Sequence, residues 1–556
     1  MPQKLELTWY GKDEPMQIEP RLLIENAELS NCKPKSKTEN MLIHGDNLLA
    51  LKALESQYAG KVKCIYIDPP YNTGSAFEHY DDNLEHSIWL GLMKRRLEFL
   101  SCLLCDDGFI CCHINDDESA YLKVLMDEVF GRGNYLTTFF IQVRYPEKTL
   151  KQDMAFHKEI EQIHIYRKRF GAVPNQKKVY KSLDKYCYYF VEKGSGREIT
   201  LGGKKTIVFS EDEYEIIQRE GSSDGRKEIW ASGTILDGNS SGRFFRDYLT
   251  GRVAEDGLGV LYKVYGIGDD KFDFRYFTGP KKAGATKGKY YQGVPLTVLE
   301  TPDSGQSVPI ENFYDLAANF GNCRQEGGVE FRSGKKPERL LQTIIEFFSN
   351  PGDLVLDSFL GSGTTAAVAH KMGRRWIGIE MGDHAYSHCK VRLDKVISGE
   401  DNGGITKDVQ WQGGGEYRFF ELAPSLINYD LMDQPIFNRE YNAEMLAAAV
   451  ALHEGYKYQP DDKVFWKQSV SNEKSWLFVT TRHVTVDFLS TIVSTMNEGE
   501  YLFVAARSFD SAAERAYKQI TVKKIPEMLL KRCKFGKKDY NLNIVHPPVY
   551  EDEDEE

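Results

Sequence analysis

Val62-Lys63-Cys64-Ile65-Tyr66-Ile67-Asp68-Pro69-Pro70-Tyr71 joins an apolar run to a stiff, polar turn. The apolar run predicts a buried strand that ends at Asp68, because proline cannot donate to a sheet. Proline also restricts the residue before it, so the carbonyls of Asp68 and Pro69 keep one orientation. The Asp68 carboxylate and a neighbouring carbonyl can then accept hydrogen bonds from one amino group, and Tyr71 supplies an aromatic face. The motif predicts a pocket for an exocyclic amine on a flat heterocycle. Four residues alone leave an ordinary strand-ending turn equally well supported.

A second motif lies about 290 residues further on, counted along the printed sequence. It follows the strand-like residues 354–356, precedes a helical run over residues 366–372, and reads Asp357-Ser358-Phe359-Leu360-Gly361-Ser362-Gly363-Thr364-Thr365. Glycines without a Cβ and a helix start with free N–H groups allow a ligand to lie against the backbone. Glu380 ends the next strand-like run, Trp376 to Ile379, nineteen positions after Gly361. That spacing is typical of the acidic residue that binds the ribose hydroxyls of a nucleoside cofactor.

The glycine loop also invites comparison with dinucleotide-binding dehydrogenases. Those loops carry a third glycine, whereas Ala366 and Ala367 follow Thr365 here, and no constellation for hydride transfer accompanies the loop. A cofactor without a pyrophosphate, together with an amine pocket, favours S-adenosylmethionine over NAD.

On these residues the chain resembles the β-class amino-methyltransferases of DNA, in which the target-amine motif precedes the cofactor loop, a circularly permuted motif order. It looks most like the modification (Mod) subunits of Type III restriction-modification systems over residues 40–170 and 270–395. The stretch behind the pocket carries this likeness through Asn72-Thr73-Gly74, Tyr80-Asp81-Asp82, Trp89-Leu90, Met93, Arg95 and Arg96-Leu97-Glu98. Two departures are Ser358, where the family more often has proline, and Gly334-Lys335-Lys336-Pro337, a partial match to the usual helix-opening signature.

The resemblance implies a role for each motif residue. The Asp68-Pro69-Pro70-Tyr71 loop would hold the target base, and aspartate rather than serine at position 68 implies adenine N6 over cytosine N4. The cofactor would be S-adenosyl-L-methionine, with its ribose on Glu380 and its remaining contacts from Asp357, Phe359, Gly361, Gly363 and Thr364. Asp46 would close the adenine end of the cofactor pocket. An N-cap for a helix that starts at Leu48 is an equally weighted alternative for Asp46.

The predicted reaction needs no covalent enzyme intermediate. An adenine N6 lone pair is delocalised into the ring, so acceptors that bind its hydrogens favour the pyramidal, nucleophilic form. Positioning this nitrogen in line with the methyl donor can contribute on the order of 7–11 kcal/mol. Because the amine is buried in a duplex, the base must first swing out, at a cost of a few kcal/mol.

Composition limits the remaining possibilities. The chain has 556 residues, 41% of them hydrophobic, which predicts two to four compact domains. No apolar run is long enough to span a bilayer and the first twenty residues do not read as a signal peptide, so we expect a cytoplasmic protein. Cys102-x-x-Cys105 with Cys111, Cys112 and His113 could suggest zinc. Cys102 and Cys105 fall on a predicted helix with an apolar face and Cys111-Cys112 in a predicted strand, so packing is favoured and no metal site is predicted.

A net charge of −11 excludes a uniformly basic DNA binder, so DNA contacts must be local. Residues 263–292 interleave cations with aromatic side chains. The predicted DNA-binding residues are Arg275, Lys281, Lys282, Lys287 and Lys289. Cations on a flexible backbone suit phosphate contact, and the aromatic rings could stack or wedge. The alternative is a surface hairpin with an aromatic core.

These features predict an α/β protein with a doubly wound, Rossmann-like sheet. The expected parts are the target half of the methyltransferase domain at 1–171, an irregular target-recognition insertion at 172–330, the cofactor half at 331–400, a small C-terminal α/β domain at 401–550 and an acidic tail at 551–556. The resemblance implies duplex DNA, a homodimer partner and a helicase-nuclease restriction subunit. The C-terminal domain would contact one of these protein partners, or simply brace the catalytic domain.

Three alternatives remain at this point. They are a stand-alone DNA amino-methyltransferase, for adenine N6 or cytosine N4, without a restriction partner; a related methyltransferase for RNA or a protein amide; and a DNA-binding subunit that kept the fold without the activity.

Overall fold

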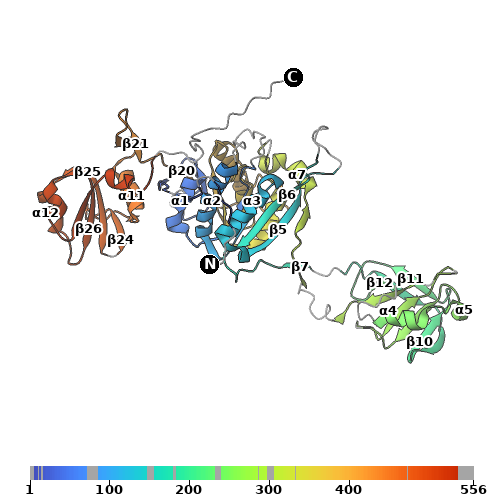
Figure 1. Ribbon diagram of the computed structural model, residues 1–556. Coiled ribbons are helices and arrows are strands. Elements are labelled where there is room, and N and C mark those ends of the chain that lie inside the picture. Colours follow the sequence, from blue (N-terminus) through green and yellow to red (C-terminus); the bar gives the residue numbers. More distant parts are fainter. Residues whose placement is uncertain are drawn as a thin grey trace, which may run out of the picture. The chain divides into compact units, whose positions relative to one another are not determined.

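The computed structural model describes the chain at residues 6–9, 12–13, 17–34, 36–71, 86–146, 156–179, 183–231, 240–268, 270–282, 284–285, 287–296, 306–331, 334–472 and 474–535 (Figure 1). Two features of the sequence fall outside these ranges: the motif continuation from Asn72 to Asp82 and the acidic tail 551–556. The chain divides into two compact units. One consists of Met1–Asn175 with Glu311–Glu556, and the other of Gln176–Ile310.

A sheet of ten strands, counted over the described residues, forms the centre of the larger unit. In spatial order the strands are β1 (Leu23–Glu25), β20 (Arg418–Leu422), β2 (Met41–His44), β19 (Arg375–Glu380), β18 (Leu354–Asp357), β3 (Val62–Ile67), β4 (Leu104–Ile114), β6 (Ile160–Arg167), β5 (Tyr135–Gln142) and β17 (Phe313–Asp315). The run from β20 to β4 is parallel throughout. β6 runs antiparallel to both of its neighbours, β4 and β5.

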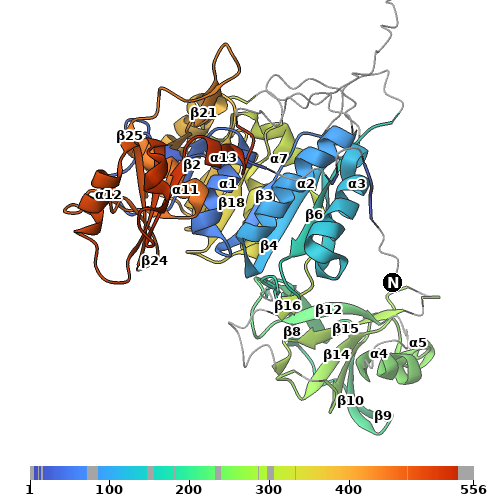
Figure 2. The same cartoon turned by 60° about the vertical axis from the view of Figure 1, so that its left-hand side comes forward.

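Helices cover both faces of this sheet, as a doubly wound fold requires. α1 (Asn47–Tyr58), α2 (His86–Leu103) and α3 (Asp116–Met126) lie together on one face (Figure 2). The other face carries α8 (Glu338–Phe348), α9 (Thr364–Lys371) and α10 (Val391–Ser398), with the π-helical turn η5 (Ala385–Lys390). Alternation along β4 shows the two sides: Ile110 joins the core under α1 and α2, while the ring of Phe109 lies 5.1 Å from that of Phe348 in α8. The doubly wound α/β fold is therefore confirmed.

The central strands are buried on both faces. Every residue of β18 is buried, and so are five of the six residues of β3. Continuous apolar strands of this kind are typical of parallel sheets, because helices remove both faces from water. This explains why the predicted strand at 62–67 coincides with β3, and why the observed strands β18 and β19 are only one or two residues longer than the predicted runs 354–356 and 376–379.

Two predicted boundaries are corrected. Residues 311–330 were expected in the insertion, but β17 pairs in parallel with β5 and lies in the larger unit, together with α7 (Ala317–Asn322). Residues after 400 were expected in a separate domain, but β20 pairs with β2 and completes the central sheet. Both strands are short and take their place through pairing with distant partners, which local sequence patterns do not reveal.

A smaller α/β part follows β20. Its five strands are β23 (Lys457–Tyr458), β24 (Ser469–Asn472), β25 (Ser475–Val484), β26 (Tyr501–Phe509) and β27 (Ile520–Lys524), and β25 to β27 are parallel. Helices α11 (Ala443–Glu454), α12 (Val486–Val493) and α13 (Glu527–Leu530) accompany them, after a hairpin of β21 (Ile427–Tyr429) and β22 (Pro435–Phe437). Strands and helices both occur here, as the predicted α/β character of this region requires.

The unit 176–310 is regular, which corrects the expectation of an irregular insertion. Its antiparallel sheet has the order β11 (Tyr214–Gln218), β8 (Tyr188–Glu192), β12 (Arg226–Ala231), β15 (Gly288–Gly293), β14 (Phe274–Thr278), β13 (Leu261–Tyr265), β10 (Lys204–Phe209) and β9 (Arg197–Leu201). α4 (Ser240–Phe244), η3 (Phe245–Leu249) and α5 (Val253–Asp256) complete it, and β7 (Lys177–Val179) pairs with β16 (Gln306–Val308). Strands of five or six residues with mixed polarity carry too little periodic signal to be predicted one by one.

Within the described ranges, no helix is both long and apolar enough to cross a membrane.

Candidate active site

The two sequence motifs lie on neighbouring strands. β3 and β18 are paired in parallel, so the loop after Ile67 and the loop after Asp357 leave the same edge of the sheet. Asp68 and Asp357 are close enough for the charge of Asp68 to raise the pKa of Asp357. Ligands of open α/β sheets bind at this edge.

A residue of α2 forms a hydrogen bond with the backbone of the Asp68–Tyr71 loop. The indole Nε1 of Trp89, a fully buried residue, donates a 2.7 Å hydrogen bond to the carbonyl of Pro70. Tyr71 Oη donates a 2.7 Å hydrogen bond to Oδ1 of Asp68. The Pro70 carbonyl therefore already accepts a hydrogen bond from the protein. Tyr71, in the same loop, fixes the orientation of the Asp68 carboxylate.

A lysine from a distant segment completes this loop. Nζ of Lys336 lies 3.1 Å from Oδ2 of Asp68 and donates a 2.7 Å hydrogen bond to Tyr71 Oη. The same Nζ lies 3.3 Å from Oε2 of Glu161, at the amino end of β6. An ionised carboxylate can accept about four hydrogen bonds. Oδ1 of Asp68 accepts a hydrogen bond from Tyr71, and Oδ2 pairs with Lys336. Each oxygen therefore keeps a free acceptor site, and the Asp68 side chain is 19% exposed.

Glu161 continues the network into the sheet. Its Oε2 lies 2.8 Å from Nε2 of His113, whose Nδ1 lies 2.7 Å from the hydroxyl of Tyr66. Burial holds the pKa of Tyr66 well above its usual range. Burial alone would raise the pKa of Glu161, but Lys336 and His113 outweigh it and hold that pKa well below its ordinary value.

The Asp357 carboxylate is hydrogen-bonded by residues of the glycine loop and of the helix that follows it. Asp357 is 2% exposed and accepts a 2.5 Å hydrogen bond from the Thr365 hydroxyl and a 2.9 Å bond from the Phe359 amide. Burial nevertheless raises the pKa of Asp357 to about 7. A buried carboxyl with this pKa suits a cationic ligand, which would favour its charged form.

The predicted glycines differ in their surroundings. Gly361 has a φ of +56° and nothing within 4 Å of the place where a Cβ would stand. Gly363 has a φ of +80°, and a Cβ there would lie 3.2 Å from the Cα of Cys389. Open space therefore lies over Gly361, whereas Gly363 permits close packing against η5. The Thr364 hydroxyl, 2.7 Å from a guanidinium nitrogen of Arg392, belongs to the buried start of α9.

Glu380 bridges the glycine loop and the next turn. This residue, 2% exposed, accepts a 2.7 Å hydrogen bond from the Gly361 amide on one oxygen and a 3.0 Å bond from Gly382 on the other. It ends β19, directly beside the end of β18. The carboxylate thus lies where the strand order places a cofactor contact.

Asp46 caps α1, as one of its two predicted interpretations requires. Its side chain accepts hydrogen bonds from the amides of Leu48 at 2.8 Å and Leu49 at 3.2 Å. It also stands at the end of β2, whose His44 pairs with Glu380, so its predicted cofactor role remains a prediction. The adjacent Asn47 donates a 2.8 Å hydrogen bond to the Ser358 carbonyl and so ties the start of α1 to the glycine loop.

A cofactor such as S-adenosylmethionine fits this edge of the sheet. The open space over Gly361 gives it room against the backbone, Glu380 offers acceptors for hydroxyl groups, and Asp357 offers a carboxylate for a cation. These three features come from two adjacent strand ends.

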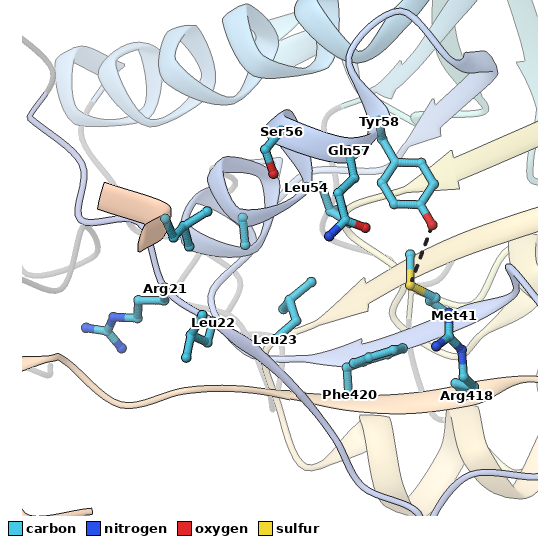
Figure 3. Close-up of a pocket in the computed structure, with 12 residues that line it drawn as sticks. Arg21, Leu22, Leu23, Met41, Leu54, Ser56, Gln57, Tyr58, Arg418 and Phe420 are labelled. Atoms are coloured by element: carbon cyan, nitrogen blue, oxygen red, sulfur yellow. Dashed lines mark hydrogen bonds between the residues drawn. The ribbon is translucent and has the colours of Figure 1, made fainter. Parts of the chain in front are cut away.

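A separate cavity of about 270 Å³ lies away from this edge (Figure 3). Met41 and Arg418, the first residues of β2 and β20, line it together with Leu54 and Tyr58 of α1. It therefore lies toward the amino ends of the parallel strands, where no motif residue lies.

The predicted DNA-binding residues fall into two groups. The prediction for Arg275 is wrong: Arg275 is 3% exposed, and its guanidinium forms a 2.7 Å ion pair with Asp270 inside the smaller unit. Lys289 is half-buried and paired with Glu228 at 2.7 Å. Lys281, Lys282 and Lys287 are exposed, so their contact with DNA remains a prediction.

The aromatic side chains of this segment form a core. Tyr276, Phe277, Tyr290 and Tyr291 are at most 4% exposed, and Tyr276 stacks on Phe190 at 4.1 Å. Stacking or wedging by these four rings is therefore excluded, and the predicted alternative of an aromatic core holds for them. Trp230, outside the predicted segment, is 62% exposed and lies beneath Nζ of Lys289.

The packing prediction for the cysteine cluster holds for Cys111 and Cys112 only, because Cys102 is exposed and Cys105 is half-buried. Cys111 and Cys112 are buried in β4, and no group of residues suited to hold a metal occurs in the part of the chain that the structure describes. Cys105 was expected on a helix, but α2 ends at Leu103 and Cys105 belongs to β4.

Lys336, Glu161, His113 and Trp89 were not predicted as site residues. Lys336 and Trp89 were noted only as parts of family-like signatures, and Glu161 is the second residue of β6. A charged residue in a buried strand is a usable signal, but it does not say where that strand will lie.

Residues 62–390 match the model of the DNA methylase family, which is more than half of the chain. The chain belongs to this family. It is similar to the "Probable type III restriction-modification enzyme HindVI Mod subunit" of Haemophilus influenzae, with 34% identity over 72% of the chain and 56% of that protein. It is also similar to the "Type III restriction-modification enzyme StyLTI Mod subunit" of Salmonella typhimurium, with 27% identity over 64% of the chain and 54% of that protein.

The chain thus spans little more than half the length of these curated relatives. Among solved structures, the M1.HpyAVI–SAM complex shares 14% identity with a TM-score of 0.30, over 64% of this chain and 99% of that one.

Proposed function

We propose that this protein transfers a methyl group from S-adenosyl-L-methionine to adenine N6 in duplex DNA, as the modification subunit of a Type III restriction-modification system. The observation that carries the proposal is the pairing of β3 with β18, which puts the Asp68 carboxylate beside the glycine loop. Membership of the DNA methylase family and the likeness to Mod subunits support it.

In this proposal the chain supplies position and hydrogen-bond acceptors. Asp68 and the Pro69 carbonyl accept the two hydrogens of the target amine, which frees the nitrogen lone pair for attack. Trp89 occupies the Pro70 carbonyl, so that carbonyl does not compete for the amine. Tyr71, half-buried, offers part of its ring to the flipped base. The cofactor would supply an electrophilic methyl group on a sulfonium, and Asp68 would take the proton that the amine loses.

The cofactor residues divide the rest of the work. Glu380 would hold the ribose hydroxyls, Asp357 would face positive charge on the cofactor, and Gly361 would let the cofactor approach the loop backbone. Phe359, Gly363 and Thr364 shape the loop, and Asp46 stands at the adenine end. Duplex DNA would lie along Lys281, Lys282 and Lys287 of the smaller unit. A second copy of the chain and a helicase-nuclease subunit are the proposed protein partners.

Methyl transfer to nucleic acid tests the proposal directly. The purified chain is incubated with methyl-tritiated S-adenosylmethionine and, separately, unmethylated plasmid DNA, total RNA and a protein mixture, with Asp68→Ala as the matched control. We expect label in DNA only, recovered as N6-methyladenine by mass spectrometry and absent with Asp68→Ala. Label recovered as N4-methylcytosine would correct the target base, and label in RNA or protein alone would refute the proposal.

Sequencing the DNA of cells that express this chain alone adds the recognition site. Methylation-sensitive reads should show one short sequence context that carries N6-methyladenine. The same cells expressing Asp68→Ala should show none.

A further inference from the structure

The ammonium group of Lys336 lies between two carboxylates that come from separate strands. Its Nζ is 3.1 Å from Asp68, 3.3 Å from Glu161 and 2.7 Å from Tyr71 Oη, and it lies 4.9 Å from the centre of the Tyr71 ring. The side chain is 8% exposed. Lys336 therefore contacts both functional side chains of the target loop without occupying all acceptor sites of Asp68.

The segment that carries Lys336 is anchored on the cofactor side of the fold. Lys336 precedes Pro337, after which α8 begins with Glu338. Glu338 is fully buried and paired at 2.8 Å with Lys371 of α9 and at 2.8 Å with Arg392 of α10. α9 is the helix that follows the glycine loop. Lys336 thus connects the target loop to the elements that position the cofactor loop.

The charges around Lys336 depend on one another. Burial alone would lower the pKa of Lys336, but the carboxylates of Asp68 and Glu161 raise it, so the ammonium form is kept. The groups that face this cluster are Asp68, Tyr66 and Tyr71 from β3 and its loop, Cys112 and His113 from β4, Glu161 from β6 and Asp357 from β18. Lys336 is the cation that contacts both carboxylates within the described residues. Without it, two carboxylates would meet in a buried site, which raises the pKa of at least one of them.

We propose that Lys336 is a positioning residue for methyl transfer, which pairs with the Asp68 carboxylate, keeps it aimed at the target amine and uses Glu161 as its counter-charge. The inference rests on the proposed function, because it assigns Asp68 to the target amine. Lys336 acts through Asp68 and Tyr71 and touches neither the methyl group nor the base. Glu161 acts one step further away, by holding Lys336 and, through His113, the hydroxyl of Tyr66.

Lys336→Met removes the charge but keeps an unbranched side chain of similar length. We expect its kcat on unmethylated plasmid DNA to fall about 100-fold at pH 7.5, as for other small misplacements of a reacting group. Binding of S-adenosylmethionine, measured by calorimetry, should stay within about threefold, because the cofactor residues are untouched. Lys336→Arg keeps the charge in a longer, planar group and should retain more kcat than Lys336→Met.

The pH profile separates positioning by charge from a purely structural role. In Lys336→Met the acid limb of kcat should move to higher pH, by at least about one unit, because Asp68 and Glu161 now repel each other. Glu161→Gln should move the limb the other way, to lower pH, because Asp68 then has the ammonium to itself. The double variant Lys336→Met/Glu161→Gln should return the limb toward the wild-type position and be more active than Lys336→Met alone.

Several results would overturn the role proposed for Lys336. A Lys336→Met enzyme with wild-type kcat, or one whose kcat falls by the same factor at every pH, would overturn the inference. If Lys336→Met does not fold, as circular dichroism and thermal unfolding would show, an unchanged acid limb in Glu161→Gln overturns it instead. Failure of the wild-type protein to methylate DNA refutes the proposed function, and it is thereby distinguished from a failure of the Lys336 variants alone.

Discussion

The two units of this molecule use charged residues in opposite ways. At the edge of the parallel sheet, Asp68, Glu161 and Lys336 are largely buried and share hydrogen bonds while Asp68 keeps acceptor sites available. In the unit 176–310, Arg275 forms an ion pair with Asp270, and Lys289 forms one with Glu228. Asp68 is therefore available to a ligand, whereas the ion pairs of Arg275 and Lys289 lie within their own unit.

The largest expected effect comes from the edge of the parallel sheet. Asp68→Ala should lower kcat by at least about 1,000-fold, because the amine loses its principal acceptor and its alignment together. Cofactor affinity should stay within a few-fold, since the proposed cofactor contacts Asp357 and Glu380 end β18 and β19. Single-turnover methylation and calorimetry measure the two quantities. A comparable loss in both would contradict the division between target loop and cofactor loop.

The matching change in the other unit should affect stability instead of chemistry. Arg275→Met leaves Asp270 buried without its ion-pair partner, which typically costs about 3–5 kcal/mol. Denaturant unfolding of the whole protein, followed by limited proteolysis of residues 176–310, measures this loss. A stable Arg275→Met protein that had lost DNA affinity would restore the rejected assignment.

The exposed lysines of the same unit provide the contrast. Replacing Lys281, Lys282 and Lys287 together by Gln should leave stability within about 0.5 kcal/mol, as expected for surface sites. If all three contact phosphates, the slope of log Kd for DNA against log salt should fall by up to about 2.7. An unchanged salt slope would remove these residues from the DNA-binding surface.

The cofactor side should respond in binding. Glu380→Ala removes the acceptor predicted for the ribose and leaves the Gly361 amide unpaired, so cofactor Kd should rise about 100-fold, as for a lost charge-assisted hydrogen bond. Glu380→Gln is the control that keeps the shape and one acceptor. Equal cofactor affinity in wild type and Glu380→Ala would argue against the ribose contact.

Asp357 should make cofactor binding depend on pH. Its pKa is raised to about 7, so the carboxylate form that favours a cation is fully populated above this pH and is lost as pH falls through it. Between pH 8 and pH 6, cofactor affinity should fall by about tenfold, because most Asp357 side chains are carboxylates one pH unit above the pKa and most are protonated one pH unit below it. Asp357→Asn should abolish this dependence. A wild-type affinity that is flat over this range would refute the assignment.

The smallest effect is expected at Trp89. Trp89→Phe keeps the buried ring but removes the hydrogen bond to the Pro70 carbonyl, so kcat should fall about tenfold through a less rigid loop, consistent with roughly 1 kcal/mol for one hydrogen bond. Thermal unfolding of the same variant checks that the core is intact. Wild-type kcat in Trp89→Phe would show that the prolines alone hold the loop.

Much of the parallel sheet could be predicted because its strands are continuous apolar runs with motif residues at their ends. The run 62–67 predicted β3 without error, and the strand-like runs 354–356 and 376–379 lie within β18 and β19. The unit 176–310 could not be predicted in this way, because its short strands mix charges and aromatic side chains on both faces. Arg275 and Lys281 look alike in the sequence, and only their pairing and burial distinguish them.

The sequence by itself determined the doubly wound fold, the strand that precedes each motif, and the helix that follows the glycine loop. It could do so because strand ends, prolines and glycines act locally. The tertiary structure alone decided that β6 runs antiparallel beside β4, which carries its first residues to the edge where the parallel strands end. Only that reversal brings Glu161 to Lys336 and Asp68, because contacts between residues 68, 161 and 336 depend on strand order and direction and not on spacing along the chain.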